Sequence, residues 1–325
     1  MRIAAVVIVA LAVAGLAQGA TSGTRVKIFE IRIDGKGRRA VLNSNARGDI
    51  LDVSRDGKHI LYLDGSGLPD GLYVAGIDGS HRKRIANIED DITNPVFSPD
   101  GRTVAFTGSP SEDCYCFRVW VVNSDGSGLR VFAADAVKPS FSPDSKKLAY
   151  LGQYLWDAQA GTLTIANVRG ASRPREIGPE SNLNETLQLV WSPRGDRLAA
   201  STDAREIRVH NVSRPGAPTR FPGDLPSWSP DGTRIAFHSA RFPTAVFVAR
   251  ADGSRRRWLS AGYGPVWSPD GQWIAFTYGR CTQLYVIRPA GRGRRQLTHA
   301  RCGANYDTFW APDSKRLIYE LTRYG

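Results

Sequence analysis

Five aspartates recur at one position of a repeated phrase, and carboxylates are the first candidates for catalysis or metal binding. They are Asp100, Asp144, Asp231, Asp270 and Asp313, and each follows a Ser-Pro or Ala-Pro pair. A carboxylate can transfer protons or coordinate a metal ion. In a turn, however, an aspartate accepts hydrogen bonds from the backbone just after it. Because all five share the same local phrase, we interpret them as turn residues and predict no metal site.

Histidine and nucleophile motifs give little support to an enzyme. The five histidines are spread along the chain, at positions 59, 81, 210, 238 and 299. The sequence contains no Gly-x-Ser-x-Gly elbow, no His-Glu-x-x-His and no Cys-x-x-Cys, the motifs of common hydrolases and zinc sites. We therefore predict a non-catalytic protein without a cofactor. Paired loop carboxylates leave no motif, so a lyase or hydrolase that uses them is the alternative.

Four cysteines could form disulfide bonds. Cys114 and Cys116 share one short segment, and Cys281 and Cys302 flank another. Four cysteines allow three connectivities, and disulfides persist only in oxidising compartments. We predict a bond between Cys281 and Cys302. A tight Cys114–Cys116 bond is possible in principle, and four free thiols are the alternative.

A repeat supplies the elements that hold these residues. An aromatic residue followed by Ser-Pro-Asp-Gly begins at Phe97, Trp228 and Trp267, with degenerate copies at Phe141, Trp191 and Trp310 and the weakest at Val53. The second residue of each copy falls at positions 54, 98, 142, 192, 229, 268 and 311, which gives spacings of 44, 44, 50, 37, 39 and 43. That period is typical of a β-propeller blade of four short strands.

Each repeat contains two hairpins. Proline presets the turn, aspartate bonds the backbone after it, and glycine accepts positive φ, so the phrase joins strands A and B. A second signal, such as Asp125-Gly126, joins strands C and D. The chain begins with an unmatched C–D hairpin near residues 28–42 and ends with an unmatched A–B hairpin at residues 309–321. Joined, these halves complete a seventh blade and close the ring.

These phrases resemble those of the TolB-like propellers, the WD40-like Pro-Asp (PD40) repeat family. The resemblance covers nearly the whole chain after the first twenty residues. It implies an all-β, exported propeller that often serves as a platform for protein binding. The best-known periplasmic member has six blades and an additional N-terminal α/β domain, so six blades is the alternative to our count of seven.

The ends of the chain and its charge predict the compartment. Met1-Arg2 precedes an apolar run to Leu16 and small residues to Ala20, the pattern of a secretory signal peptide. We therefore expect a signal peptide over 1–20 and one propeller domain over 21–325, periplasmic or extracellular, monomeric and without a membrane span. The formal net charge is +12, and loss of Arg2 leaves 12 − 1 = +11, which favours anionic neighbours.

The two faces of a propeller differ in their residues: the A–B and C–D turns form one face, here named the turn face, and the B–C and D–A loops form the other, the loop face. Basic clusters such as Arg255-Arg256-Arg257 lie at the C–D turns, where we expect weak binding of anionic polymers. The B–C and D–A loops on the other face are longer and carry aromatic side chains suited to interfaces. The candidate binding residues there are Tyr115, Tyr154, Trp156, Tyr263 and Tyr306. We predict that this face binds a protein or glycan, whereas catalytic loop carboxylates at the central channel would make the protein a lyase or hydrolase.

Overall fold

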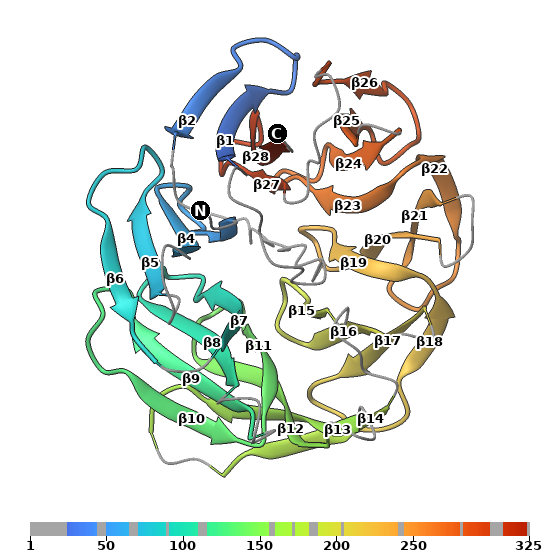
Figure 1. Ribbon diagram of the computed structural model, residues 1–325. Helices are drawn as coiled ribbons and strands as arrows, with labels where there is room; N and C mark the ends of the chain where they lie inside the picture. Colours follow the sequence, from blue (N-terminus) through green and yellow to red (C-terminus); the bar gives the residue numbers. More distant parts are fainter. Residues whose placement is uncertain are drawn as a thin grey trace.

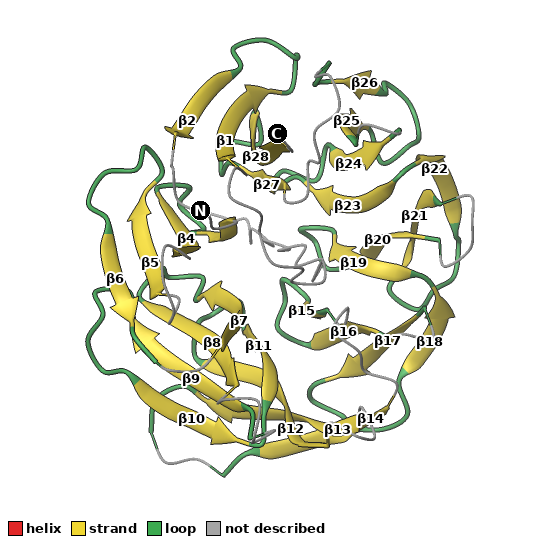
Figure 2. Cartoon of the chain, viewed as in Figure 1, coloured by secondary structure: helices red, strands yellow, loops and turns green. Residues whose placement is uncertain are grey.

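The computed structural model is an all-β ring of seven four-stranded antiparallel sheets (Figures 1 and 2). It describes residues 25–43, 50–64, 71–88, 91–109, 116–155, 160–170, 173–181, 188–202, 205–239, 244–279, 282–299 and 308–323. Within these ranges there are strands and turns but no helix. The predicted β-propeller is confirmed, with seven blades rather than six.

Six blades are continuous in sequence. Blade 1 contains β3 (Ile50–Val53), β4 (His59–Asp64), β5 (Gly71–Gly76) and β6 (Lys83–Ala86). Blade 2 contains β7 (Asp91–Phe97), β8 (Thr103–Ser109), β9 (Arg118–Asn123) and β10 (Arg130–Ala134). Blade 3 contains β11 (Val137–Phe141), β12 (Lys147–Leu155), β13 (Ala160–Asn167) and β14 (Arg175–Ser181).

The remaining three continuous blades follow the same order. Blade 4 contains β15 (Leu189–Trp191), β16 (Arg197–Ser201), β17 (Glu206–Asn211) and β18 (Thr219–Pro222). Blade 5 contains β19 (Asp224–Trp228), β20 (Arg234–His238), β21 (Ala245–Arg250) and β22 (Arg257–Ala261). Blade 6 contains β23 (Tyr263–Trp267), β24 (Ile274–Tyr278), β25 (Gln283–Ile287) and β26 (Arg295–Gln296).

The seventh sheet, here named the closing blade, combines the two ends of the chain. Its order is β2 (Arg39–Asn43), β1 (Arg25–Arg32), β28 (Arg316–Arg323) and β27 (Thr308–Trp310). β1 and β28 lie side by side in Figure 1 and pair over eight residues, from Arg25↔Arg323 to Arg32↔Arg316. The unmatched hairpins therefore join as predicted, and the ring is closed by strand pairing.

The repeated aspartates hold turns. In blade 2, Asp100 Oδ1 accepts the Ser98 hydroxyl at 2.6 Å and the Arg102 N–H at 3.1 Å. Gly101 has a φ of 71°, as the turn requires. Blade 4 has arginine at the aspartate position, and there the Ser192 hydroxyl donates instead to Asp196 at 2.6 Å. The interpretation of these aspartates as turn residues agrees with this geometry.

The aromatic residues before the turns form the contacts between blades. Trp228 and Trp267 are among the largest fully buried side chains. The Trp228 indole donates to the Val190 carbonyl of the previous blade at 3.2 Å, and Trp310 donates to Val266 at 3.0 Å. An apolar ring with one satisfied donor suits a buried seam between sheets. These aromatic residues therefore hold neighbouring blades together.

Candidate anion-binding site

The loop aromatics predicted from the sequence are only partly described. Tyr115, Trp156 and Tyr306 lie outside the described residues, as do Cys114, Cys281 and Cys302. Tyr154 is half-buried at the end of β12, edge-on to Phe117 at 5.7 Å between ring centroids. Tyr263 is half-buried at the start of β23, and burial raises its pKa. The two described tyrosines belong to blades 3 and 6, so the structure does not bring them together.

Cys116 is disulfide-bonded. Since the three other cysteines lie outside the described residues, the pairing of Cys281 with Cys302 stays a prediction.

Some arginines of the basic C–D turns pack on aromatic rings. Arg256 Cζ lies 4.5 Å from the ring centroid of Phe247, and Arg38 Cζ lies 3.9 Å from that of Phe29. Such cation–π contacts contribute roughly 0.5–1 kcal/mol at exposed sites. Part of the basic turn face therefore has a structural use.

Six of the seven outer strands also begin with a basic residue, and the seventh has one at its second position. Arg39, Lys83, Arg130, Arg175, Arg257 and Arg295 open β2, β6, β10, β14, β22 and β26, and Arg220 is the second residue of β18. Charged side chains on edge strands disfavour pairing with other chains. The seven-fold recurrence thus has a structural explanation that requires no ligand.

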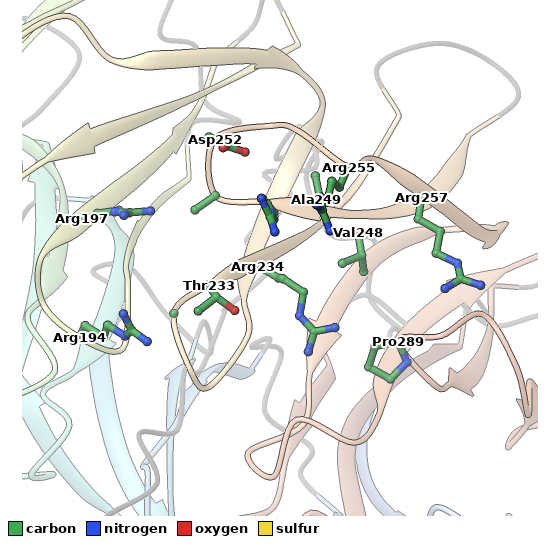
Figure 3. Close-up of a pocket in the computed structure, with 13 residues that line it drawn as sticks. Arg194, Arg197, Thr233, Arg234, Val248, Ala249, Asp252, Arg255, Arg257 and Pro289 are labelled. Atoms are coloured by element: carbon green, nitrogen blue, oxygen red, sulfur yellow. The ribbon is translucent and has the colours of Figure 1, made fainter.

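On the turn face, arginines of two neighbouring blades also line a pocket. A pocket of about 660 Å³ lies on blade 5 where it meets blades 4 and 6. Figure 3 shows Arg194 and Arg197 on one side, Thr233 and Arg234 in the middle, and Arg257 with Pro289 on the far side. The full lining is Arg194, Arg197, Gly232, Thr233, Arg234, Val248, Ala249, Arg250, Ala251, Asp252, Arg255, Arg257 and Pro289. Its volume lies in the range of ligand sites, about 300–1,000 Å³.

The floor of this pocket holds a cross-strand pair of like charges. Arg234 of β20 and Arg250 of β21 are directly opposite each other, a position where side chains meet and like charges destabilise a sheet. Arg234 lies over Trp267, 4.8 Å from its ring centroid. Within the described part of the chain, neither arginine nor the neighbouring Arg257 has a carboxylate within 4 Å.

Two nearby aspartates attract these arginines without forming ion pairs with them, since the charge of Arg234 acts on Asp231 and that of Arg250 acts on Asp252. Asp231 Oδ1 accepts the Ser229 hydroxyl at 2.6 Å and the Thr233 hydroxyl at 2.8 Å. Asp252 Oδ1 accepts the Ser254 N–H at 2.9 Å, and its hydrogen bonds to Ser254 hold its pKa below the usual value. Both carboxylates therefore serve their own turns rather than an ion pair.

The chemistry of the pocket follows from its side chains. Six of the lining residues are arginines and one is an acid, Asp252. Guanidinium groups stay protonated, donate two parallel hydrogen bonds to a carboxylate or phosphate, and accept no proton. The arrangement can bind an anion but offers little for proton transfer. Arg255 and Arg257 were predicted from the sequence as basic turn residues, whereas Arg194, Arg197, Arg234 and Arg250 were not predicted to bind an anion.

A second cluster of ionisable groups lies on the opposite face. Asp224 and His238 are directly paired across β19 and β20, with 3.9 Å between Oδ2 and Nε2. Burial lowers the pKa of His238, partly offset by the negative charge of Asp224. His238 Nδ1 is buried without a hydrogen-bond partner. This pair is the feature that fits the enzyme alternative.

Within the described ranges, no three His, Cys, Asp or Glu side chains come close enough to hold a metal ion. No helix in those ranges could cross a membrane.

The sequence matches no family model and no curated protein. Solved structures do match. A protein of Agrobacterium tumefaciens assigned as a TolB is 17% identical, with 94% of this chain and 100% of that one aligned and a TM-score of 0.56. An oligogalacturonate lyase of Vibrio parahaemolyticus is 14% identical, over 74% and 76% of the two chains, with a TM-score of 0.56.

A puromycin-hydrolysing peptidase of Mycobacterium tuberculosis is 13% identical over 84% of this chain, with a TM-score of 0.60. This chain spans about half of that peptidase, 52%. Such low identities are evidence for a shared fold, which hosts different functions in these proteins. In its fold, the chain is a TolB-like β-propeller with seven blades.

Proposed function

We propose that this protein is an exported, non-catalytic scaffold that binds a protein or glycan partner, and that the pocket on blade 5 takes the partner's anionic groups. The cross-strand pair Arg234 and Arg250, neither of which forms an ion pair within the described residues, is the observation that carries the proposal. Exposed arginines held in a hollow attract anions, and a guanidinium–carboxylate pair can be bidentate. The signal-like residues 1–20 and the TolB-like fold support export.

The proposal moves the principal contact from the loop face to the turn face. The sequence favoured the loops because irregular, aromatic segments often bind partners. A contact through Tyr115, Tyr154, Trp156, Tyr263 and Tyr306 stays a prediction. The arginine pocket offers a more definite chemistry, since its residues, charges and volume are all described.

Capture of partners from envelope or secreted material tests the proposal. The triple variant R234Q/R250Q/R257Q removes three charges from the pocket. The control K58Q/R102Q/K146Q removes three charges at the A–B turns of blades 1, 2 and 3, on the same face. We expect the pocket variant to lose the partner and the control to keep it. Equal capture by both variants, in material checked for folding, would contradict the proposal.

A lyase or hydrolase acting at the loop face is the second candidate. The half-buried Asp224–His238 pair favours it, because a histidine with a lowered pKa is neutral near pH 7 and can accept a proton. Two structural neighbours are a lyase and a peptidase by description. Turnover of uronate oligomers or peptide anilides that disappears in both D224N and H238Q would support this candidate. No turnover by the wild type on either panel would count against it.

A further inference from the structure

The closing blade contains the same arginines as blade 5 at matching positions of its sheet. Arg32 pairs with Arg316 across β1 and β28, as Arg250 pairs with Arg234 across β21 and β20. The outer strands match too, since Glu30 is opposite Arg39 and Val248 is opposite Arg257. Even the ring contact recurs, with Arg38 over Phe29 and Arg256 over Phe247.

In the closing blade, acids neutralise this arginine set. Glu30 accepts hydrogen bonds from Arg39, with 2.7 Å between Nε and Oε2, and from Arg316. Arg32 pairs with Asp34 at 2.8 Å. Arg316 also pairs with Asp313 at 2.7 Å. Arg32, Arg39 and Arg316 therefore each have a carboxylate partner inside the protein.

Blade 5 lacks the central acid. The position of Glu30 is taken by Val248, which lines the pocket and is labelled in Figure 3. The two other acids have counterparts, Asp252 for Asp34 and Asp231 for Asp313. Asp252 accepts a hydrogen bond from the Ser254 hydroxyl, and Asp231 accepts hydrogen bonds from the Ser229 and Thr233 hydroxyls. The closing blade has Ala311 in the place of Ser229. The pocket thus lies where the closing blade holds a buried glutamate side chain.

We propose that a glutamate or aspartate side chain, in an acidic segment of a partner protein, fills this place in blade 5. Its carboxylate lies between Arg234 and Arg257 as that of Glu30 lies between Arg316 and Arg39. The inference rests on the proposed function, since it specifies the anion that the pocket binds. A peptide carboxylate is favoured because the fold already accommodates one, in the closing blade, with this set of arginines. Arg194 on the facing wall receives a further acid of the same segment, whereas Arg197 beside it already lies 3.8 Å from Asp196.

The variant Val248→Glu tests the inference by supplying the missing acid within the chain. The probe is fluorescent hexaglutamate with blocked ends, titrated at fixed low salt. We expect V248E to bind it about tenfold or more weakly than the wild type, because the internal carboxylate occupies the arginines. V248Q, of the same size but uncharged, fills the same space without neutralising the arginines, so it should bind the probe more weakly than the wild type but more tightly than V248E. Thermal melts establish that each variant is folded.

Two further measurements complete the test. E30Q leaves only Arg39 without a carboxylate, because Arg32 keeps Asp34 and Arg316 keeps Asp313, so about one hexaglutamate should still bind; a second bound hexaglutamate would mean that the probe binds any exposed arginine and would count against the blade 5 pocket. A blocked hexagalacturonate that binds the wild type more tightly than hexaglutamate would overturn the assignment to a peptide.

The outcomes separate this inference from the proposed function. If R234Q/R250Q/R257Q loses the probe but folded V248E binds it like the wild type, the placement of the carboxylate is wrong and the anion pocket stands. If the arginine triple variant also binds like the wild type, the pocket itself is wrong.

Discussion

The closing blade and blade 5 use one set of arginines in two ways. In the closing blade, Glu30 on the first strand of the chain binds Arg316 on the last, 286 residues away. No turn connects β28 directly to β1, so the ion pairs help to hold the ring shut. In blade 5, β20 and β21 are consecutive and need no such contact. The comparison teaches that a repeated unit can pair its arginines with carboxylates in one copy and leave the matching arginines without an ion pair in another.

Removing the C-terminal hairpin gives the largest expected effect. Deletion of residues 309–325 removes β28 and most of β27, and with them the eight-residue pairing to β1. The exposed edges should cause aggregation or a broad, non-cooperative unfolding transition. Size-exclusion chromatography and calorimetry measure both. A monomer that melts as sharply as the whole chain would show that closure matters little to stability.

Asp52 of blade 1 contrasts with Glu30, because it is a buried acid that forms no ion pair with an arginine within the described residues. It accepts the Phe97 N–H at 2.7 Å, and burial raises its pKa to about 7. Its unfolded pKa is about 3.9, so the folded protein binds this proton more tightly. The stability from this group is complete below about pH 4 and is lost as the pH rises to about 7, by at most ~4 kcal/mol.

The control for that prediction is present in blade 5. There Ser227 stands at the position of Asp52 and accepts the Trp267 N–H at 3.0 Å without titrating. Urea unfolding at several pH values should therefore show a flatter profile between about pH 4 and 7 for D52S than for the wild type. Parallel profiles for the two proteins would mean that Asp52 titrates at its ordinary value.

Replacing Glu30 tests what the closing blade gains from its acid. In E30Q, Arg39 and Arg316 lose their charged acceptor, although both reach solvent, with 68% and 43% of their side chains exposed. We expect a loss of about 1–2 kcal/mol in the free energy of unfolding, below the cost of stranding fully buried charges. Urea titration checks this value. An unchanged free energy of unfolding would mean that the closing blade gains no stability from its acid.

Adding the acid to blade 5 gives the smallest expected effect on stability. V248E places a carboxylate beside Arg234 and Arg257, which are partly or fully exposed. Such ion pairs contribute about 0.5–1 kcal/mol, which offsets part of the cost of placing a charge at Val248, a core position only 6% exposed. The melting temperature of V248E should therefore change by only a few degrees and should fall as salt is raised. A melting temperature with the salt dependence of V248Q would mean that the arginines do not reach the new carboxylate.

The repeat made most of the fold predictable from local signals. Pro-Asp-Gly turns and short apolar strands act over four to eight residues, so the strand pairs of each blade could be read from the chain. Unmatched hairpins at residues 28–42 and 309–321 predicted the shared blade, because an open edge in a ring must find a partner. Blade 4, with Arg194 at the aspartate position, kept its turn through Asp196, a substitution that local reasoning could also have found.

The pocket was harder to predict from the sequence, although the sequence contained one signal of it. Aligning the strands of the two blades places Val248 at the position of Glu30 and Arg234 at that of Arg316, which would have marked blade 5 as short of an acid. That alignment depends on the register between strands, which the repeat fixes only within each hairpin.

The sequence by itself determined the strands, the turns, the count of seven blades and the joining of the ends, because these follow from patterns within each repeat and from the need to pair edges. Only the tertiary structure brought Arg194 of blade 4, Arg250 of blade 5 and Pro289 of blade 6 around one pocket. It also decided that Asp231 and Asp252 bond hydroxyls while Asp313 and Asp34 bond arginines. The reason is that a binding site depends on which side chains face one another across blades, and that is set by packing rather than by neighbours in the chain.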